Sequence, residues 1–161
     1  MTRRSTVVLG ACAAAAAAAV AVPLLTAGSE KPRLTKLDYS RRVTAIFAAV
    51  GEGFRLAGAG GDPTQTSASL RSMTADLDRA AARLGVLRPP RDAERDQRVL
   101  VDSTRDYATQ VDLVRASVDF GDPVNLATHL AAVTAPAAIN RAIRDLDAKG
   151  YRIPVRVGGV R

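Results

Sequence analysis

The sequence predicts an all-α protein, an up-down-up-down four-helix bundle that follows an N-terminal signal or anchor segment. Apolar residues recur at helical spacing in four separate stretches, and the turn sequence Gly-Asp-Pro occurs at 61–63 and again at 121–123. No segment with the period-two alternation of a strand competes with these helices. Similar lengths and short connections are typical of such a bundle. We divide the chain into a signal peptide or membrane anchor at 1–27, a linker at 28–35, the bundle at 36–150 and a basic C-terminal tail at 151–161.

The N-terminal segment has the layout of a secretory signal. Arg3 and Arg4 precede a stretch without charge that runs from Val7 to Ala27 and ends in small residues. We therefore expect the protein to be exported, either secreted or associated with the cell envelope. Cleavage after Ala27 would also remove Cys12, the only cysteine.

Three alternatives for this segment stay open. The uncharged stretch at 7–27 is long enough to span a bilayer if it is not cleaved, and it would then anchor the protein. Leu9-Gly10-Ala11-Cys12 resembles a lipobox, but the longer apolar stretch follows this cysteine instead of preceding it. The sequence at 2–7 resembles a twin-arginine signal in which Thr6 replaces the preferred Phe, so the export route stays undecided.

The first two helices have clear boundaries. The first is predicted over 36–59, where apolar residues follow steps of three and four until a glycine-rich stretch ends it. In the second, Asp62 can accept hydrogen bonds from the first amides, Pro63 suits the first helical position and Gln65 completes a capping box. Gly85 ends this helix before Pro89 and Pro90.

The third helix is predicted from near Asp92 to Phe120, and the fourth from Pro123 to Lys149. Pro136 lies inside the fourth helix, where it should produce a kink because proline removes one backbone hydrogen bond. We leave the tail after Gly150 unassigned. The expected core consists of Tyr39, Val43, Ile46, Val50, Phe54, Leu70, Met73, Leu77, Leu84, Leu100, Tyr107, Val111, Val114, Leu130, Val133, Ile143 and Leu146.

A resemblance to known proteins supports this fold. An export signal, a first helix that contains Tyr and Phe, leucines from Leu77 to Leu84 before Leu87-Arg88-Pro89-Pro90, and a long charged helix follow one another. This order resembles small exported helical proteins of actinobacteria, which are secreted proteins or lipoproteins of uncharacterised function. The similarity covers roughly residues 36 to 150, and many of these relatives have a true lipobox. The resemblance implies the fold and the compartment, and it implies no activity.

The composition excludes several kinds of site. The 161 residues include one Cys, one His and no Trp, so neither a disulfide framework nor a histidine-rich metal site can form. His129 flanks the apolar stripe of the fourth helix, where it is either a boundary residue without a ligand or a contact for haem or another apolar ligand held between the helices. We expect neither a metal nor a cofactor.

The third helix is rich in acidic residues, but arginines alternate with them at spacings that favour ion pairs. Asp102 and Asp106 lie one turn apart, while Glu94 and Arg98, like Arg115 and Asp119, are four residues apart. This pattern is typical of a solvated helix face. No serine lies in a Gly-x-Ser-x-Gly turn, and the glycines before Asp62 lack the Lys-Ser/Thr that a phosphate loop needs. We therefore expect a protein without enzymatic activity.

Basic residues concentrate near both termini of the expected mature chain. In an up-down bundle the two termini lie at the same end of the molecule. These basic residues could form one positive pole that contacts lipid head groups or cell-wall polymers. The sequence thus favours a binding or scaffolding module at the cell envelope, with an anionic membrane, a wall polymer or another envelope protein as partner. Nucleic acid is not an expected partner, because an exported protein is separated from the nucleic acids of the cell and because aromatic residues are few. The candidate contact residues are Lys31, Arg33, Lys36, Arg41, Arg42, Arg152 and Arg156.

Overall fold

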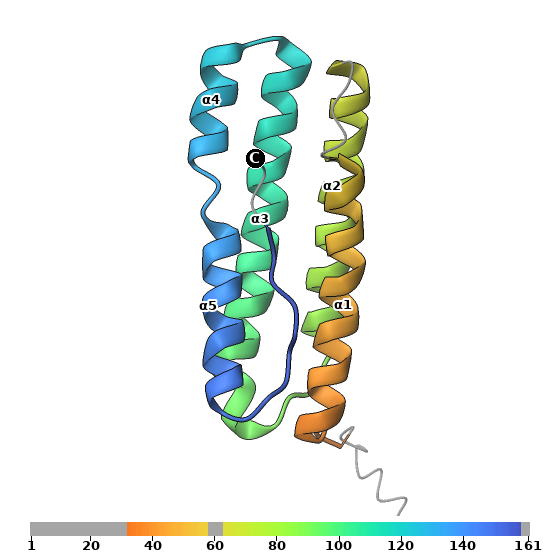
Figure 1. Ribbon diagram of the computed structural model, residues 1–161, viewed down its shortest axis with the longest axis vertical. Coiled ribbons are helices and arrows are strands. Elements are labelled where there is room, and N and C mark those ends of the chain that lie inside the picture. Colours follow the sequence, from red (N-terminus) through yellow and green to blue (C-terminus); the bar gives the residue numbers. More distant parts are fainter. Residues whose placement is uncertain (1–31, 58–62, 159–161) are drawn as a thin grey trace, which may run out of the picture. The chain divides into compact units, whose positions relative to one another are not determined.

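The structure, a computed structural model, describes residues 32–57 and 63–158 (Figure 1). Its elements are α1 (Lys36–Ala57), α2 (Pro63–Gly85), the short 3-10 helix η1 (Arg91–Ala93), α3 (Glu94–Phe120), α4 (Pro123–Ala131) and α5 (Ala135–Ala148). The described residues contain no strand, so the prediction of an all-α protein is confirmed.

The predicted signal or anchor at 1–27 lies outside the described residues. The elements from α1 to α5 all belong to one compact unit, Lys31–Arg161. Within the part of the chain that the structure describes, no helix combines the length and the apolar character needed to cross a membrane.

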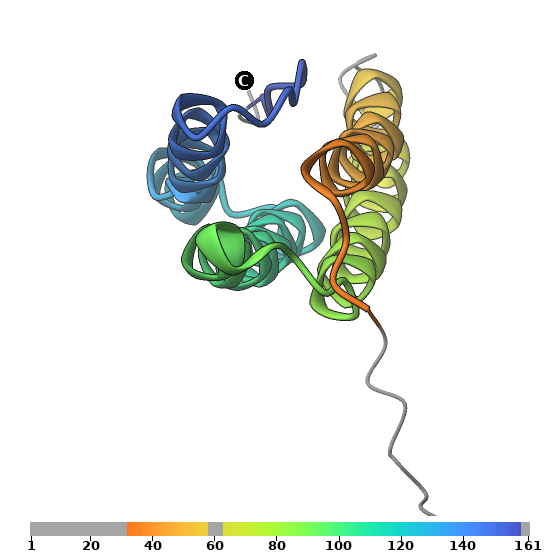
Figure 2. The ribbon, with the colours of Figure 1, turned by 90° about the horizontal axis from the view of Figure 1, so that it is seen from below.

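Helix α3 is the central element of this unit. It packs against α2, α4 and α5, and α2 packs in turn against α1. Seen along the helices in Figure 2, the C-terminal segment at 150–158 runs between α5 and α1. This segment bonds to both neighbours: the amide of Arg152 donates to Ser40 Oγ of α1 over 3.2 Å, and Asn140 of α5 exchanges two hydrogen bonds with the backbone of Val157. The gap between α1 and α5 is therefore closed by irregular chain.

Local signals in the sequence explain where the helices begin and end. At the start of α1, Thr35 Oγ1 accepts the amide hydrogen of Asp38 over 3.1 Å, and its hydroxyl donates to the Asp38 carboxylate over 2.8 Å. Gly121 after α3 and Gly150 after α5 have φ values of 64° and 86°. Only glycine adopts this conformation without cost, and both glycines form the hydrogen bonds of a Schellman motif.

The prediction of one continuous fourth helix is wrong. Two helices, α4 and α5, are separated by residues 132–134, and Pro136 lies in the first turn of α5. In a continuous helix the ring of Pro136 would collide with the carbonyl of Ala132. That carbonyl would also lose its helical hydrogen bond, because proline has no amide hydrogen to donate. Proline is tolerated in a first turn, where the amide has no helical partner. The chain therefore breaks where we expected a kink.

The predicted core is confirmed where its side chains are described. Fourteen of its seventeen members are buried, Leu130 and Val133 are partly buried, and Phe54 lies outside the described side chains. The core also includes part of the tail that the sequence left unassigned. Tyr151, Ile153 and Val157 are buried, whereas the side chains between them are exposed or half-buried. The alternation expected of a strand thus occurs at 151–157 without strand pairing.

Candidate functional site

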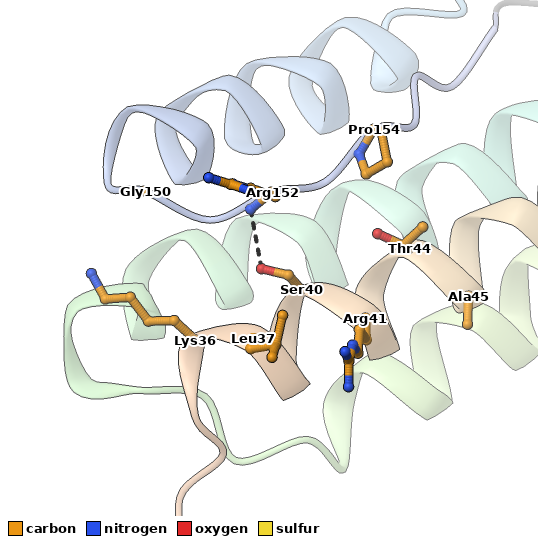
Figure 3. Close-up of a pocket in the computed structure, with 9 residues that line it drawn as sticks. All are labelled: Lys36, Leu37, Ser40, Arg41, Thr44, Ala45, Gly150, Arg152 and Pro154. Atoms are coloured by element: carbon orange, nitrogen blue, oxygen red, sulfur yellow. Dashed lines mark hydrogen bonds between the residues drawn. The ribbon is translucent and has the colours of Figure 1, made fainter.

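A groove runs between the first turns of α1 and the C-terminal segment (Figure 3). It has a volume of about 560 Å³, which is within the size range of small-molecule sites. One wall comes from α1, and the other comes from the turn at Gly150 and the chain that follows it. The groove is lined by Lys36, Leu37, Ser40, Arg41, Thr44, Ala45, Gly150, Arg152 and Pro154.

The C-terminal wall is held in place by buried contacts. Gly150 turns the chain back after α5, and Tyr151 then inserts beside Tyr39 of α1 with its hydroxyl bonded to Asp92 over 2.7 Å. Because successive side chains of this segment alternate between core and solvent, Arg152 points outward. Its amide still bonds to Ser40 Oγ, which fixes the backbone of this wall against α1 (Figure 3).

The charge of the groove has a single sign. Its lining includes three basic side chains and no carboxylate. Lys36 is already engaged, because its Nζ lies 2.8 Å from an Asp92 oxygen and donates to the Lys149 carbonyl over 2.9 Å. Arg41 and Arg152 are exposed and form no ion pair with another described residue. These two arginines therefore remain able to bind an external anion.

The same groove has an apolar surface. Leu37 is 58% exposed although it lies in the first turn of α1, and Ala45 and Pro154 add further apolar atoms. Burying such carbon surface against a ligand would be favourable. The groove therefore combines a free positive charge with a place for an apolar group. Leu37 gave no signal in the sequence, because it lies outside the helical stripe that predicts the core.

The predicted contact residues do not all remain available at the surface. Lys31 lies outside the described residues. Arg33 forms an ion pair with Glu94 and donates to the Pro89 carbonyl over 3.1 Å, so it joins the start of α1 to the connection before α3. Lys36 is engaged as described above.

Arg156 is likewise bound within the molecule. Its guanidinium lies 3.1 Å from an Asp147 oxygen and also donates to two backbone carbonyls. Arg42 is exposed beside Arg41 and forms no ion pair with another described residue. Arg41, Arg42 and Arg152 are thus the members of the predicted set that are exposed and form no ion pair with another described residue.

His129 has a partner that the sequence did not indicate. Its Nδ1 lies 2.7 Å from Ser117 Oγ of α3, and the Ser117 hydroxyl also lies 3.1 Å from the Leu113 carbonyl, to which it donates. Because the Leu113 carbonyl takes the hydroxyl proton, Ser117 Oγ accepts from His129 Nδ1. The contact links α4 to α3. Spacing alone could not predict it, since it depends on how α4 packs.

The acidic residues of α3 do not gather into a metal site. Among residues 32–57 and 63–158, no group of three or more His, Cys, Asp or Glu side chains is placed to hold a metal ion. Arg115 donates to Asp112 over 2.8 Å and also pairs with Asp119, and its hydrogen bond to the Asp112 carboxylate raises the pKa of the guanidinium. The predicted ion pair between Arg115 and Asp119 is confirmed, whereas Glu94, which we expected to pair with Arg98, pairs with Arg33.

Hydrogen bonds and burial shift the pKa of several groups on α1, η1, α3 and the C-terminal segment. Hydrogen bonds from Lys36 and Tyr151 lower the pKa of Asp92. Burial raises the pKa of Tyr39, Tyr107 and Tyr151, because the phenolate form would lose its hydration. Tyr39, Tyr151 and Asp92 hold the C-terminal wall of the groove in place, and none of these groups lines the groove.

Comparisons with protein-family models, curated proteins and solved structures found no match to this chain.

Proposed function

We propose that the protein is an exported, non-enzymatic helical bundle that acts as a binding module at the cell envelope, where it attaches to an anionic surface. The observation that supports this proposal is the surface formed by Arg41, Arg42 and Arg152. Arg41 of α1 and Arg152 of the C-terminal segment line one groove together with the exposed Leu37, and Arg42 follows Arg41 on α1. None of the three arginines has a carboxylate partner among the described residues. Each cation near an anionic membrane contributes about 1 kcal/mol.

Vesicle sedimentation tests the attachment. Residues 31–161, which form a compact unit, would be mixed with vesicles of neutral lipid or with vesicles that also contain phosphatidylglycerol. We expect binding to the anionic vesicles only, and we expect it to weaken as salt screens the charges. The triple variant Arg41→Gln, Arg42→Gln, Arg152→Gln should lose on the order of a hundredfold in affinity if each arginine contributes that much.

A matched variant controls for net charge. Arg95, Arg141 and Arg144 are also exposed but lie on α3 and α5, so their triple replacement by Gln removes the same charge from another surface. It should leave most of the binding. Equal binding to neutral and anionic vesicles, or equal losses in the two triple variants, would overturn the proposed surface.

The export part of the proposal rests on the pattern at 1–27 and has its own test. Cell fractionation followed by intact-mass measurement should find a chain that starts near Gly28 in the medium or the wall fraction. A full-length chain in the membrane fraction would instead assign residues 7–27 as an anchor. A full-length chain in the cytoplasm would contradict export.

A further inference from the structure

The groove beside α1 differs in charge from a second groove of similar size. That second groove, between α3 and α5, has a volume of about 550 Å³ and contains Arg95 and Arg141 together with the carboxylates of Asp96 and Asp145. Asp96 is buried and lies 2.6 Å from Lys149 Nζ, so part of this charge is neutralised internally. Of these two grooves, which are similar in size, the one beside α1 has no carboxylate in its lining.

The positive charges of the groove beside α1 suit an oxyanion. A guanidinium offers several N–H donors in a fixed plane, which matches the oxygens of a phosphate or a carboxylate. Arg41 and Arg152 come from opposite walls, and neither is neutralised by a described residue. The half-buried Thr44 adds a hydroxyl to the same lining.

A small inorganic anion would leave the apolar surface of the groove exposed to water. Leu37, Ala45 and Pro154 line the groove with carbon atoms, and Leu37 is more than half exposed. An occupant with an aliphatic chain would cover these atoms, whereas free phosphate would contact the arginines alone. The lining therefore matches a ligand with an anionic head and an apolar chain.

We propose that this groove binds one anionic phospholipid, with its phosphate held at Arg41 and Arg152 and one acyl chain lying against Leu37, Ala45 and Pro154. The inference rests on the proposed function, because it assigns the lipid contact of that function to a site. It adds that the protein selects a single lipid molecule, beyond adhering to a charged surface.

Calorimetric titration of residues 31–161 with lysophosphatidylglycerol below its critical micelle concentration tests the site. We expect saturable binding of one lipid, and a weakening of about tenfold in either Arg41→Gln or Arg152→Gln, because each removes a charged hydrogen bond. The control variant Arg141→Gln, in the other groove, should bind as the unchanged protein does. Leu37→Ser should also weaken binding, and circular dichroism would check that each variant keeps its helices.

Other ligands separate the contributions of head and chain. Neutral lysophosphatidylcholine should bind much more weakly, and inorganic phosphate should bind weakly and without any effect of Leu37→Ser. Equal affinity for the neutral and the anionic lipid would overturn the role of the arginines. An inorganic phosphate affinity equal to that of the lipid would overturn the role of the chain. Amide NMR shifts confined to α3 and α5 would place the ligand elsewhere and overturn the site.

The vesicle experiment distinguishes this inference from the proposed function. Vesicle binding without binding of the monomeric lipid would leave the surface proposal intact and overturn the groove. Saturable binding of the monomeric lipid without attachment to vesicles would support the groove and overturn the function as an attachment module.

Discussion

Tyr39 and Tyr151 pack edge to face, with ring centroids 5.5 Å apart and ring planes at 78°. This arrangement is favourable for aromatic pairs. Both rings are buried, and each hydroxyl reaches the α3 side of the molecule: Tyr39 donates to Gln97 Oε1 over 2.5 Å, and Tyr151 donates to Asp92. The pair therefore joins α1, the start of α3 and the C-terminal segment, and it fixes the wall that carries Arg152.

Replacing Tyr151 should have a large effect on stability. We expect Tyr151→Ala to lower the free energy of unfolding by about 3 to 5 kcal/mol, because it leaves a cavity where an aromatic ring was packed. Tyr151→Phe should cost only about 1 kcal/mol, since the ring stays and one hydrogen bond is lost. Urea unfolding measures both values. Val86→Ala, at a side chain that is 79% exposed, serves as the control, and a loss for Tyr151→Ala no greater than for this control would contradict the closing role of the segment.

Gln110 should stabilise the start of α5. Its side-chain oxygen accepts the amide hydrogens of Thr134 and Ala135 over 3.1 and 3.2 Å, so it acts as a cap supplied by α3. We expect Gln110→Ala to lower stability by about 1 to 2 kcal/mol and to speed amide exchange in the first turn of α5. Gln110→Glu keeps an acceptor at a helix N-terminus and should retain most of the stability. Unchanged exchange in Gln110→Ala would show that the cap contributes nothing.

The three tyrosines should resist ionisation while the protein is folded. Burial raises the pKa of each phenol above its ordinary value of 10.0. A raised native pKa means that this contribution to stability is complete below about pH 10 and is lost as the pH rises further. The phenolate absorbance of the native protein should therefore stay low at about pH 10.5, while the guanidinium-unfolded chain titrates near pH 10. A phenolate signal of ordinary midpoint with full helical dichroism would contradict this prediction.

The parts of the fold that the sequence predicts correctly depend on local signals. Gly121 and Gly150 were predicted to end helices, and they do so by a backbone conformation that is special to glycine. The cap that Thr35 and Asp38 form is equally local, although it was not predicted from the sequence. These signals do not depend on how the helices pack. Pro136 gave a correct signal of disruption, and our interpretation of it as a kink was wrong because a first-turn position removes its cost.

The groove depends on tertiary packing, so the sequence indicates only parts of it. Arg41 and Arg152 were identified as surface cations, but their presence in one groove requires the C-terminal segment to lie against α1. The alternation of Tyr151, Ile153 and Val157 with exposed residues is a signal for this packing. A period-two pattern of only seven residues after a helical region is too short to predict a packed segment. The exposure of Leu37 can be recognised only from the folded structure.

Asp92 should give the protein a specific acid sensitivity. The hydrogen bonds from Lys36 and Tyr151 lower the native pKa of this carboxyl below its ordinary value of 3.8. A lowered native pKa means that the contribution to stability is present above the ordinary value and is lost as the pH falls through the native one.

Asp92→Asn keeps an acceptor for the Tyr151 hydroxyl and removes the charge that faces Lys36. The variant should therefore be less stable than the unchanged protein at about pH 7, and the two should converge as the pH falls below the ordinary pKa of the carboxyl and through its lower native pKa. Urea unfolding at a series of pH values measures this difference, with Asp106→Asn as the control because Asp106 is exposed and forms no ion pair with another described residue. A difference between Asp92→Asn and the unchanged protein that stays constant from neutral to acidic pH would mean that packing, and not the Asp92 charge, holds this end of the bundle.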